Sequence, residues 1–151
     1  MKKILVIFII ISFYGCSGYK PILNSKDINF NIKQIEINDS DRISYSIKKK
    51  LSPFTKQLQK KINILLKINS TEQINVIAKD SKGDDSLYEL IIKTNVQIIF
   101  EDQNKQEVNF QEKFNFNNQS NKFELEQYKK DIRSDLIKKI FEKLILKLRL
   151  I

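Results

Sequence analysis

Apolar and polar residues alternate along much of the chain, which is the period of a half-buried β-strand. The alternation predicts four strands, at residues 28–38, 62–78, 88–100 and 108–116. In the first strand the parity of the apolar positions changes after Ile32, which predicts a β-bulge near Lys33 and Gln34. In the second strand the parity persists across the polar segment 70–72, which favours one long strand. A hairpin that turns at 69–73 is the alternative.

Two segments have apolar residues three or four positions apart, which is the period of an amphipathic helix. The shorter helix is expected at 40–52, because the segment 39–41 supplies N-cap candidates and Pro53 disfavours a longer helix. Residues 53–60 then connect to the next strand and allow a further short helical turn. The longer helix is expected at 124–149.

The order of these elements predicts the fold class. Turn-forming residues at 81–85 and 102–105 join the last three strands, which favours an antiparallel meander with one apolar face. Two amphipathic helices then cover that face. The sequence therefore predicts a two-layer α+β domain over residues 28–151, with a four-stranded, mainly antiparallel sheet in the order strand, helix, three strands, helix.

Residues 1–15 have the composition of a signal peptide, with two lysines followed by an apolar run of about ten residues. That run is too short to cross a hydrocarbon core about 30 Å thick. Cys16, the only cysteine of the chain, follows Gly15 at the expected cleavage position. This arrangement resembles the lipobox of bacterial lipoproteins. An ordinary secretory signal with an incidental cysteine, or an uncleaved signal anchor, is the alternative.

The lipobox resemblance implies cleavage between Gly15 and Cys16, with a diacylglycerol on the sulfur and an acyl chain on the new amino group. Two or more acyl chains anchor a protein stably, whereas one is marginal. Residues 16–27 would then form a lipidated tether. Ser17, which follows the cysteine, permits export to the outer membrane, because an aspartate at that position can retain a lipoprotein in the inner membrane.

Composition disfavours an enzyme. The chain has no histidine, which removes the commonest general base and metal ligand, and its one cysteine is expected to be acylated. With three glycines it also has no phosphate-binding glycine loop. We therefore expect no catalytic residue, no metal site and no cofactor other than the lipid on Cys16. The net charge of +9 reflects a chain rich in lysine, isoleucine and asparagine, and a tethered periplasmic domain has little access to nucleic acid.

Two groups of side chains are candidates for contact with a partner or with lipid. The phenylalanines form either the core or a contact with acyl chains or a partner, and Phe114 and Phe116 are expected to be the most accessible. This group comprises Phe110, Phe114, Phe116 and Phe123. The lysine runs are either solvated or, in part, contacts for lipid A phosphates. They are Lys48-Lys49-Lys50, Lys60-Lys61, Lys129-Lys130 and Lys138-Lys139.

The end of the long helix is apolar with a cationic face. We expect it to cover the sheet, and the alternative is a helix that lies in a membrane interface. Ile137, Phe141 and Ile145 widen its apolar stripe, which suggests a partner contact at the edge of the stripe.

Taken together, these features resemble the lipopolysaccharide-assembly lipoprotein LptE family. The resemblance covers the whole mature chain and depends chiefly on the order of elements. The motifs that carry it are the segments Cys16-Ser17-Gly18-Tyr19-Lys20-Pro21-Ile22-Leu23, which has one residue inserted after the cysteine, Asp39-Ser40-Asp41-Arg42 and Tyr88-Glu89-Leu90. It implies a lipoprotein on the periplasmic face of the outer membrane that plugs the LptD β-barrel and helps to assemble it for lipopolysaccharide insertion.

The resemblance implies binding of lipopolysaccharide through basic residues, but it assigns none of them in this chain. Two other hypotheses remain open. One is a different lipid-anchored module, such as a secretion-system pilotin or an envelope-complex subunit. The other is a periplasmic hydrolase.

Overall fold

A computed structural model describes residues 28–37, 41–55 and 62–151. The elements, in chain order, are β1 (Phe30–Ile37), α2 (Arg42–Leu51), the 3-10 helix η2 (Ser52–Phe54), β2 (Ile62–Lys79), β3 (Asp85–Phe100), β4 (Lys105–Asn117) and α3 (Lys122–Leu148). This is the predicted order. The expected signal peptide (1–15) and tether (16–27) lie outside the described residues.

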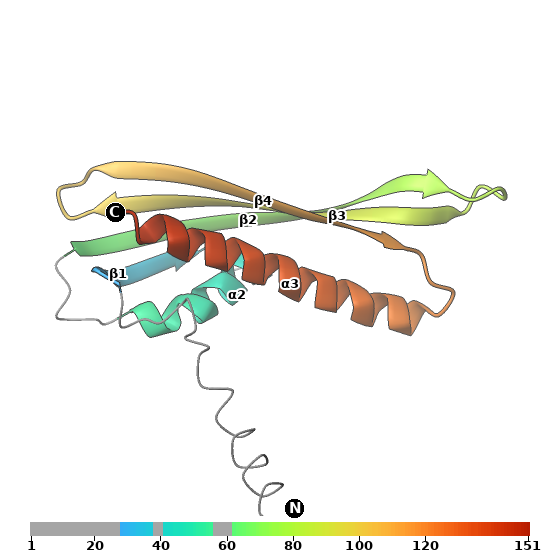
Figure 1. The fold of residues 1–151 in the computed structure, drawn as a ribbon, viewed down its shortest axis with the longest axis horizontal. Coiled ribbons are helices and arrows are strands. Elements are labelled where there is room, and N and C mark those ends of the chain that lie inside the picture. Colours follow the sequence, from blue (N-terminus) through green and yellow to red (C-terminus); the bar gives the residue numbers. More distant parts are fainter. Residues whose placement is uncertain (1–27, 38–40, 56–61) are drawn as a thin grey trace, which may run out of the picture.

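The four strands form one sheet in the order β1-β2-β3-β4 (Figure 1). β1 runs parallel to β2, whereas β2, β3 and β4 are antiparallel neighbours. The register of β1 on β2 shifts between Ile32 and Gln34, so the predicted bulge is confirmed. β2 is one strand of 18 residues, and the alternative hairpin at 69–73 is wrong. β1 accompanies β2 only as far as Ile68.

β3 and β4 each begin three residues earlier than their alternation predicted. The difference arises because the polar residues at the start of each strand also join the ladder. Asp85 pairs with Lys79, and Lys105 pairs with Ile99. Backbone pairing therefore extends to the turns, beyond the apolar alternation of each strand.

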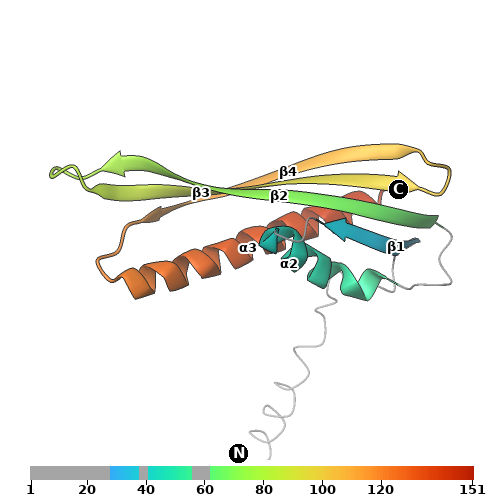
Figure 2. The ribbon, with the colours of Figure 1, turned by 180° about the vertical axis from the view of Figure 1, so that it is seen from behind.

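Both helices lie on one face of the sheet, as Figures 1 and 2 show. Asp41 is the N-cap of α2, and its side chain accepts hydrogen bonds from the backbone N–H groups of Ile43 and Ser44. Pro53 follows the end of α2 and lies in η2, so the predicted short helical turn is present. Asn121 caps α3 in the same way through Phe123 and Glu124. The two-layer α+β fold is therefore confirmed.

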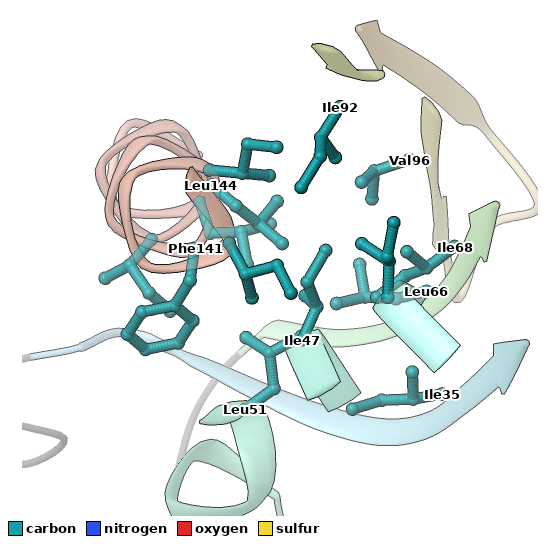
Figure 3. Close-up of a cluster of buried hydrophobic side chains, with 14 of the residues drawn as sticks. Ile35, Ile47, Leu51, Leu66, Ile68, Ile92, Val96, Phe141 and Leu144 are labelled. Carbon is teal, nitrogen blue, oxygen red and sulfur yellow. The ribbon is translucent and has the colours of Figure 1, made fainter. Parts of the chain in front are cut away.

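The core lies between the sheet and the two helices. Figure 3 shows Ile47 and Leu51 of α2 and Leu144 of α3 among the side chains of the sheet. The strand residues that face this layer are those of even number from Ile64 onward, which is the predicted parity. The fully buried ones are Ile64, Leu66, Leu90, Ile92, Val96 and Ile98.

The end of α3 covers the sheet, as expected. Ile137, Phe141 and Ile145 are buried within the domain, and the partner contact at the edge of the stripe stays a prediction. The wide apolar stripe of α3 packs against the rest of the domain. Phe141, for example, contacts Phe54 of η2 with ring centroids 6.1 Å apart. Among the described residues, no helix is both long and apolar enough to cross a membrane.

The two turns of the meander offer a matched pair of backbone tests. Gly83 has φ +88°, and a Cβ there would meet nothing within 4 Å, so only backbone strain opposes a side chain. We expect Gly83→Ala to lower the free energy of unfolding by about 1 kcal/mol. Gln103 already has φ 66°, so Gln103→Gly should not destabilise the domain. Chemical denaturation followed by circular dichroism measures both, and equal losses would contradict the strain argument.

Candidate functional site

The outer face of the sheet, which no helix covers in the described chain, is rich in amides and also carries the half-buried side chains of Leu65, Ile91 and Ile99. Asn69, Asn95 and Asn109 are register partners across β2, β3 and β4. The Asn95 amide donates to Oδ1 of Asn109 at 2.8 Å. Two of the lysines on the sheet are paired with acids, Lys67 with Glu36 at 2.9 Å and Lys113 with Glu89 at 3.0 Å. We call this surface the amide face.

Lys33 and Glu101 form a further pair, between β1 and the turn after β3. The hydrogen bond from Lys33 and its positive charge hold the pKa of the Glu101 carboxyl below its usual value. Since both side chains are exposed to solvent, this pair fixes local charge and adds little stability.

A cluster of polar side chains lies at the point where β1 ends and α2 begins. Ser44 and Thr94 are buried in it. Oδ2 of Asp41 accepts from the backbone N–H of Ser70 at 2.6 Å and from the Ser44 hydroxyl. The Ser70 hydroxyl lies 2.9 Å from that of Ser44 and 3.0 Å from that of Thr94. The cluster is fully bonded, so its role is to fix α2 on the middle of the sheet.

Sequence reasoning missed this cluster, although a signal was present. Ser70 and Thr94 occupy even-numbered positions, the parity that faces the helices, and they are register partners in β2 and β3. A polar pair on the buried face requires partners, and Asp41 and Ser44 supply them.

Next to the cluster, Arg133 of α3 forms a two-pronged ion pair with Glu72 of β2. Nε of Arg133 lies 2.5 Å from Oε2 of Glu72, and Nη2 lies 2.6 Å from Oε1. The hydrogen bond to Glu72 raises the pKa of the Arg133 guanidinium. The pair neutralises the arginine charge and ties the long helix to the strand.

The phenylalanines do not act as one group. Phe116 is 2% exposed and stacks on Tyr88 with ring centroids 5.4 Å apart, so its expected accessibility is wrong. Phe114 is 40% exposed, as expected, and Phe123 at the start of α3 is 79% exposed. Phe110 is partly buried against the core. The register explains the difference between Phe114 and Phe116, because Phe116 lies opposite Tyr88, which adds its ring to the contact.

A groove of about 650 Å³ runs between α2 and α3. From α2 it is lined by Tyr45, Ser46, Lys49 and Lys50, and from α3 by Lys130, Arg133, Ser134 and Ile137. These positions follow helical spacing, so one stripe of each helix faces the other. The lining contains four cations and no acidic side chain. We call it the basic groove.

The lysine runs of the sequence have different environments. Lys49, Lys50 and Lys130 meet in the basic groove, which spacing within one helix could not predict. Lys129 instead bonds Glu126 at 2.8 Å, with its ammonium 5.9 Å from the centroid of the Tyr88 ring. Lys138 and Lys139 line a different groove together with Asp131, Asp135 and Glu142.

Several predicted positions fall outside the described residues. These are Gly15 and Cys16 at the expected cleavage and acylation site, and the pair Lys60-Lys61. In the part of the chain that the structure describes, no group of three or more His, Cys, Asp or Glu side chains is placed to hold a metal ion.

Comparison with family models and with curated protein sequences finds no match. Comparison with solved structures finds lipoproteins of the same fold. Rare lipoprotein B from Shewanella oneidensis aligns with a TM-score of 0.57 at 13% identity, over 78% of this chain and 96% of its own. An uncharacterized lipoprotein B from Nitrosomonas europaea aligns with a TM-score of 0.59 at 12% identity, over 88% of this chain and 91% of its own. A minor lipoprotein from Acinetobacter baumannii aligns with a TM-score of 0.54 at 13% identity, over 78% of this chain and 94% of its own.

Two of these neighbours are lipoprotein B proteins and the third is a minor lipoprotein. At such identities the likeness concerns the fold. The fold that the resemblance to the LptE family implied is therefore confirmed by neighbours aligned over nearly their whole length.

Proposed function

We propose that this chain, which has the fold of rare lipoprotein B, is an outer-membrane lipoprotein that plugs an LptD-type β-barrel. It would support assembly of that barrel for the insertion of lipopolysaccharide into the outer leaflet. The observation that carries the proposal is the shared fold over almost the full length of several lipoproteins. The lipobox that ends at Cys16 supports it independently.

The surface of the domain supports a place inside a barrel. The lumen of an outer-membrane barrel is polar. The amide face offers hydrogen-bonding groups with most of its charges already paired, so a polar wall can contact it at a small desolvation cost. The role requires no covalent chemistry, which agrees with a sequence that contains no histidine.

Recovery of a barrel protein with the acylated chain tests the proposal. We expect purification from a mild detergent extract of the outer membrane to yield a large β-barrel protein in a fixed ratio. The alternative, a pilotin or envelope-complex subunit, predicts a secretion component instead. Recovery of no barrel would contradict the proposal.

A variant of the amide face sharpens the test. Asn95→Trp places a bulky side chain at the centre of the row formed with Asn69 and Asn109, and we expect it to lower recovery of the barrel. Lys48→Ala, at an exposed position of α2, is the control and should leave recovery unchanged. Circular dichroism of both variants separates a lost contact from a lost fold.

A further inference from the structure

The basic groove carries positive charge that the described protein does not neutralise. Lys49, Lys50 and Lys130 form no ion pair with any described residue. Arg133, the fourth cation, is already bonded to Glu72. Three lysine charges from two different helices therefore face one cavity. Like charges held together repel one another, so a bound anion would stabilise this arrangement.

The abundance of lysine in the chain does not explain this concentration. Eight of the other described lysines lie beside acids, either in ion pairs or in the mixed-charge groove that contains Lys138 and Lys139. The remaining six, which form no ion pair with a described residue, are Lys48, Lys82, Lys93, Lys105, Lys122 and Lys147. The paired ones are Lys33, Lys67, Lys79, Lys113, Lys129 and Lys143. α2 contributes two lysines to the groove and contains no acidic residue between Arg42 and Leu51. The excess of positive charge is thus a local property of the α2–α3 contact.

The shape and the uncharged lining of the groove narrow the class of anion. Its volume of about 650 Å³ exceeds what a bare inorganic ion fills and lies in the range of small-molecule sites. Ile137 is buried at its base, and the ring of Tyr45 stands exposed at its rim. A phosphate ester with an uncharged organic body matches this combination of charge and apolar surface.

The groove lies close in the fold to the start of the described chain, and this indicates that the phosphate ester belongs to a membrane lipid. Phe30, near the start of the described chain, stacks on Phe54 with ring centroids 6.4 Å apart, and Phe54 follows Lys50 by four residues. The expected anchor at Cys16 precedes Ile28 by twelve residues, which span at most about 40 Å when fully extended. A tether of this length keeps the groove of an anchored domain within reach of a surface dense in phosphate esters.

We infer that the basic groove binds the phosphate of an anionic lipid head group in the bilayer that holds the anchor, through Lys49, Lys50 and Lys130. The exposed ring of Tyr45 contacts the uncharged part of the head group. The inference rests on the anchored part of the proposed function, and it does not require the barrel.

Chemical labelling of lysines tests the inference on the full acylated protein. The protein is placed in nanodiscs of phosphatidylcholine, or of phosphatidylcholine partly replaced by phosphatidylglycerol, and acetylation of each lysine is followed by mass spectrometry. We expect phosphatidylglycerol to slow acetylation of the three groove lysines and to leave Lys138 and Lys139 unchanged. Free glycerol phosphate at the same phosphate concentration should give no protection. Protection by glycerol phosphate equal to that by the lipid would overturn the assignment to a lipid, and absence of protection would overturn the site.

A pair of double variants separates the groove from general charge attraction. Lys49→Ala with Lys130→Ala and Lys138→Ala with Lys139→Ala remove the same net charge, each from exposed helix positions. We expect the groove variant alone to lower the enrichment of phosphatidylglycerol that co-purifies with the protein, by about tenfold. Equal losses in the two variants would show general attraction and contradict the inference.

The same samples keep this inference distinct from the proposed function. Intact mass reports the acyl chains, and recovery of the barrel reports the partner. Protection of the groove lysines without a barrel would leave the groove assignment standing while the proposed function fails. Recovery of a barrel without protection of the groove lysines would support the proposed function and overturn the groove assignment.

Discussion

Replacing Cys16 by serine is expected to remove the protein from the outer-membrane fraction. Serine has no sulfur to carry diacylglycerol, so the acyl chains and the cleavage that depends on them are both lost. Each buried CH₂ of an acyl chain contributes about 0.8 kcal/mol to membrane attachment. Loss of several chains should therefore lower recovery in the outer membrane by far more than tenfold. Membrane fractionation and intact mass measure the two effects together.

Ser17→Ala is the matched control for this substitution, because it alters the neighbouring residue and keeps the thiol. It should retain the acyl mass and the outer-membrane location. An ordinary secretory signal predicts a cleaved protein without acyl mass whether residue 16 is cysteine or serine. An uncleaved signal anchor predicts an unchanged location and retention of residues 1–15. Either pattern would contradict acylation at Cys16.

The fold could be predicted largely because its strands alternate against one covered face. Parity favoured β2 as one strand across the polar residues 70–72 over a hairpin, and the change of parity after Ile32 located the bulge. The N-cap Asp41 was among the candidates because a short acidic segment preceded the helical period. Each of these features depends on residues close in sequence, which is why one sequence was sufficient.

The surfaces depend on contacts between distant elements, and the sequence predicted them less well. Phe114 and Phe116 have the same parity, yet Phe116 is buried because Tyr88 and Tyr128 pack against it. Lys129 and Lys130 are adjacent, yet one pairs with Glu126 within α3 and the other faces α2. Helical spacing gives the face of each residue, but the relative placement of two helices decides which faces meet.

Replacing Asp41 by alanine is expected to lower the free energy of unfolding by about 2–4 kcal/mol, because it removes a helix cap and leaves a partly buried N–H unbonded. Oδ1 of Asp41 accepts from the backbone N–H groups of Ile43 at 3.0 Å and Ser44 at 2.9 Å. Oδ2 accepts from the N–H of Ser70. One side chain therefore ends the pairing of β1 with β2, starts α2 and positions that helix over the sheet. Urea denaturation of the acylated protein in neutral detergent, followed by circular dichroism, measures the loss.

Asp41→Asn separates the two functions of this carboxylate. Asparagine keeps the oxygen that caps α2, but it places an amide N–H₂ where Oδ2 accepts from Ser70, so two donors face each other. The expected loss is smaller than that of alanine and larger than that of Ser44→Ala, which removes only the hydroxyl bonds of the cluster. A ranking in which asparagine equals wild type would mean that the bond to Ser70 contributes nothing. In that case the buried residues Ile43, Ile47 and Leu51 would hold α2 on the sheet without help from the carboxylate, and Asp41 would act only as the cap.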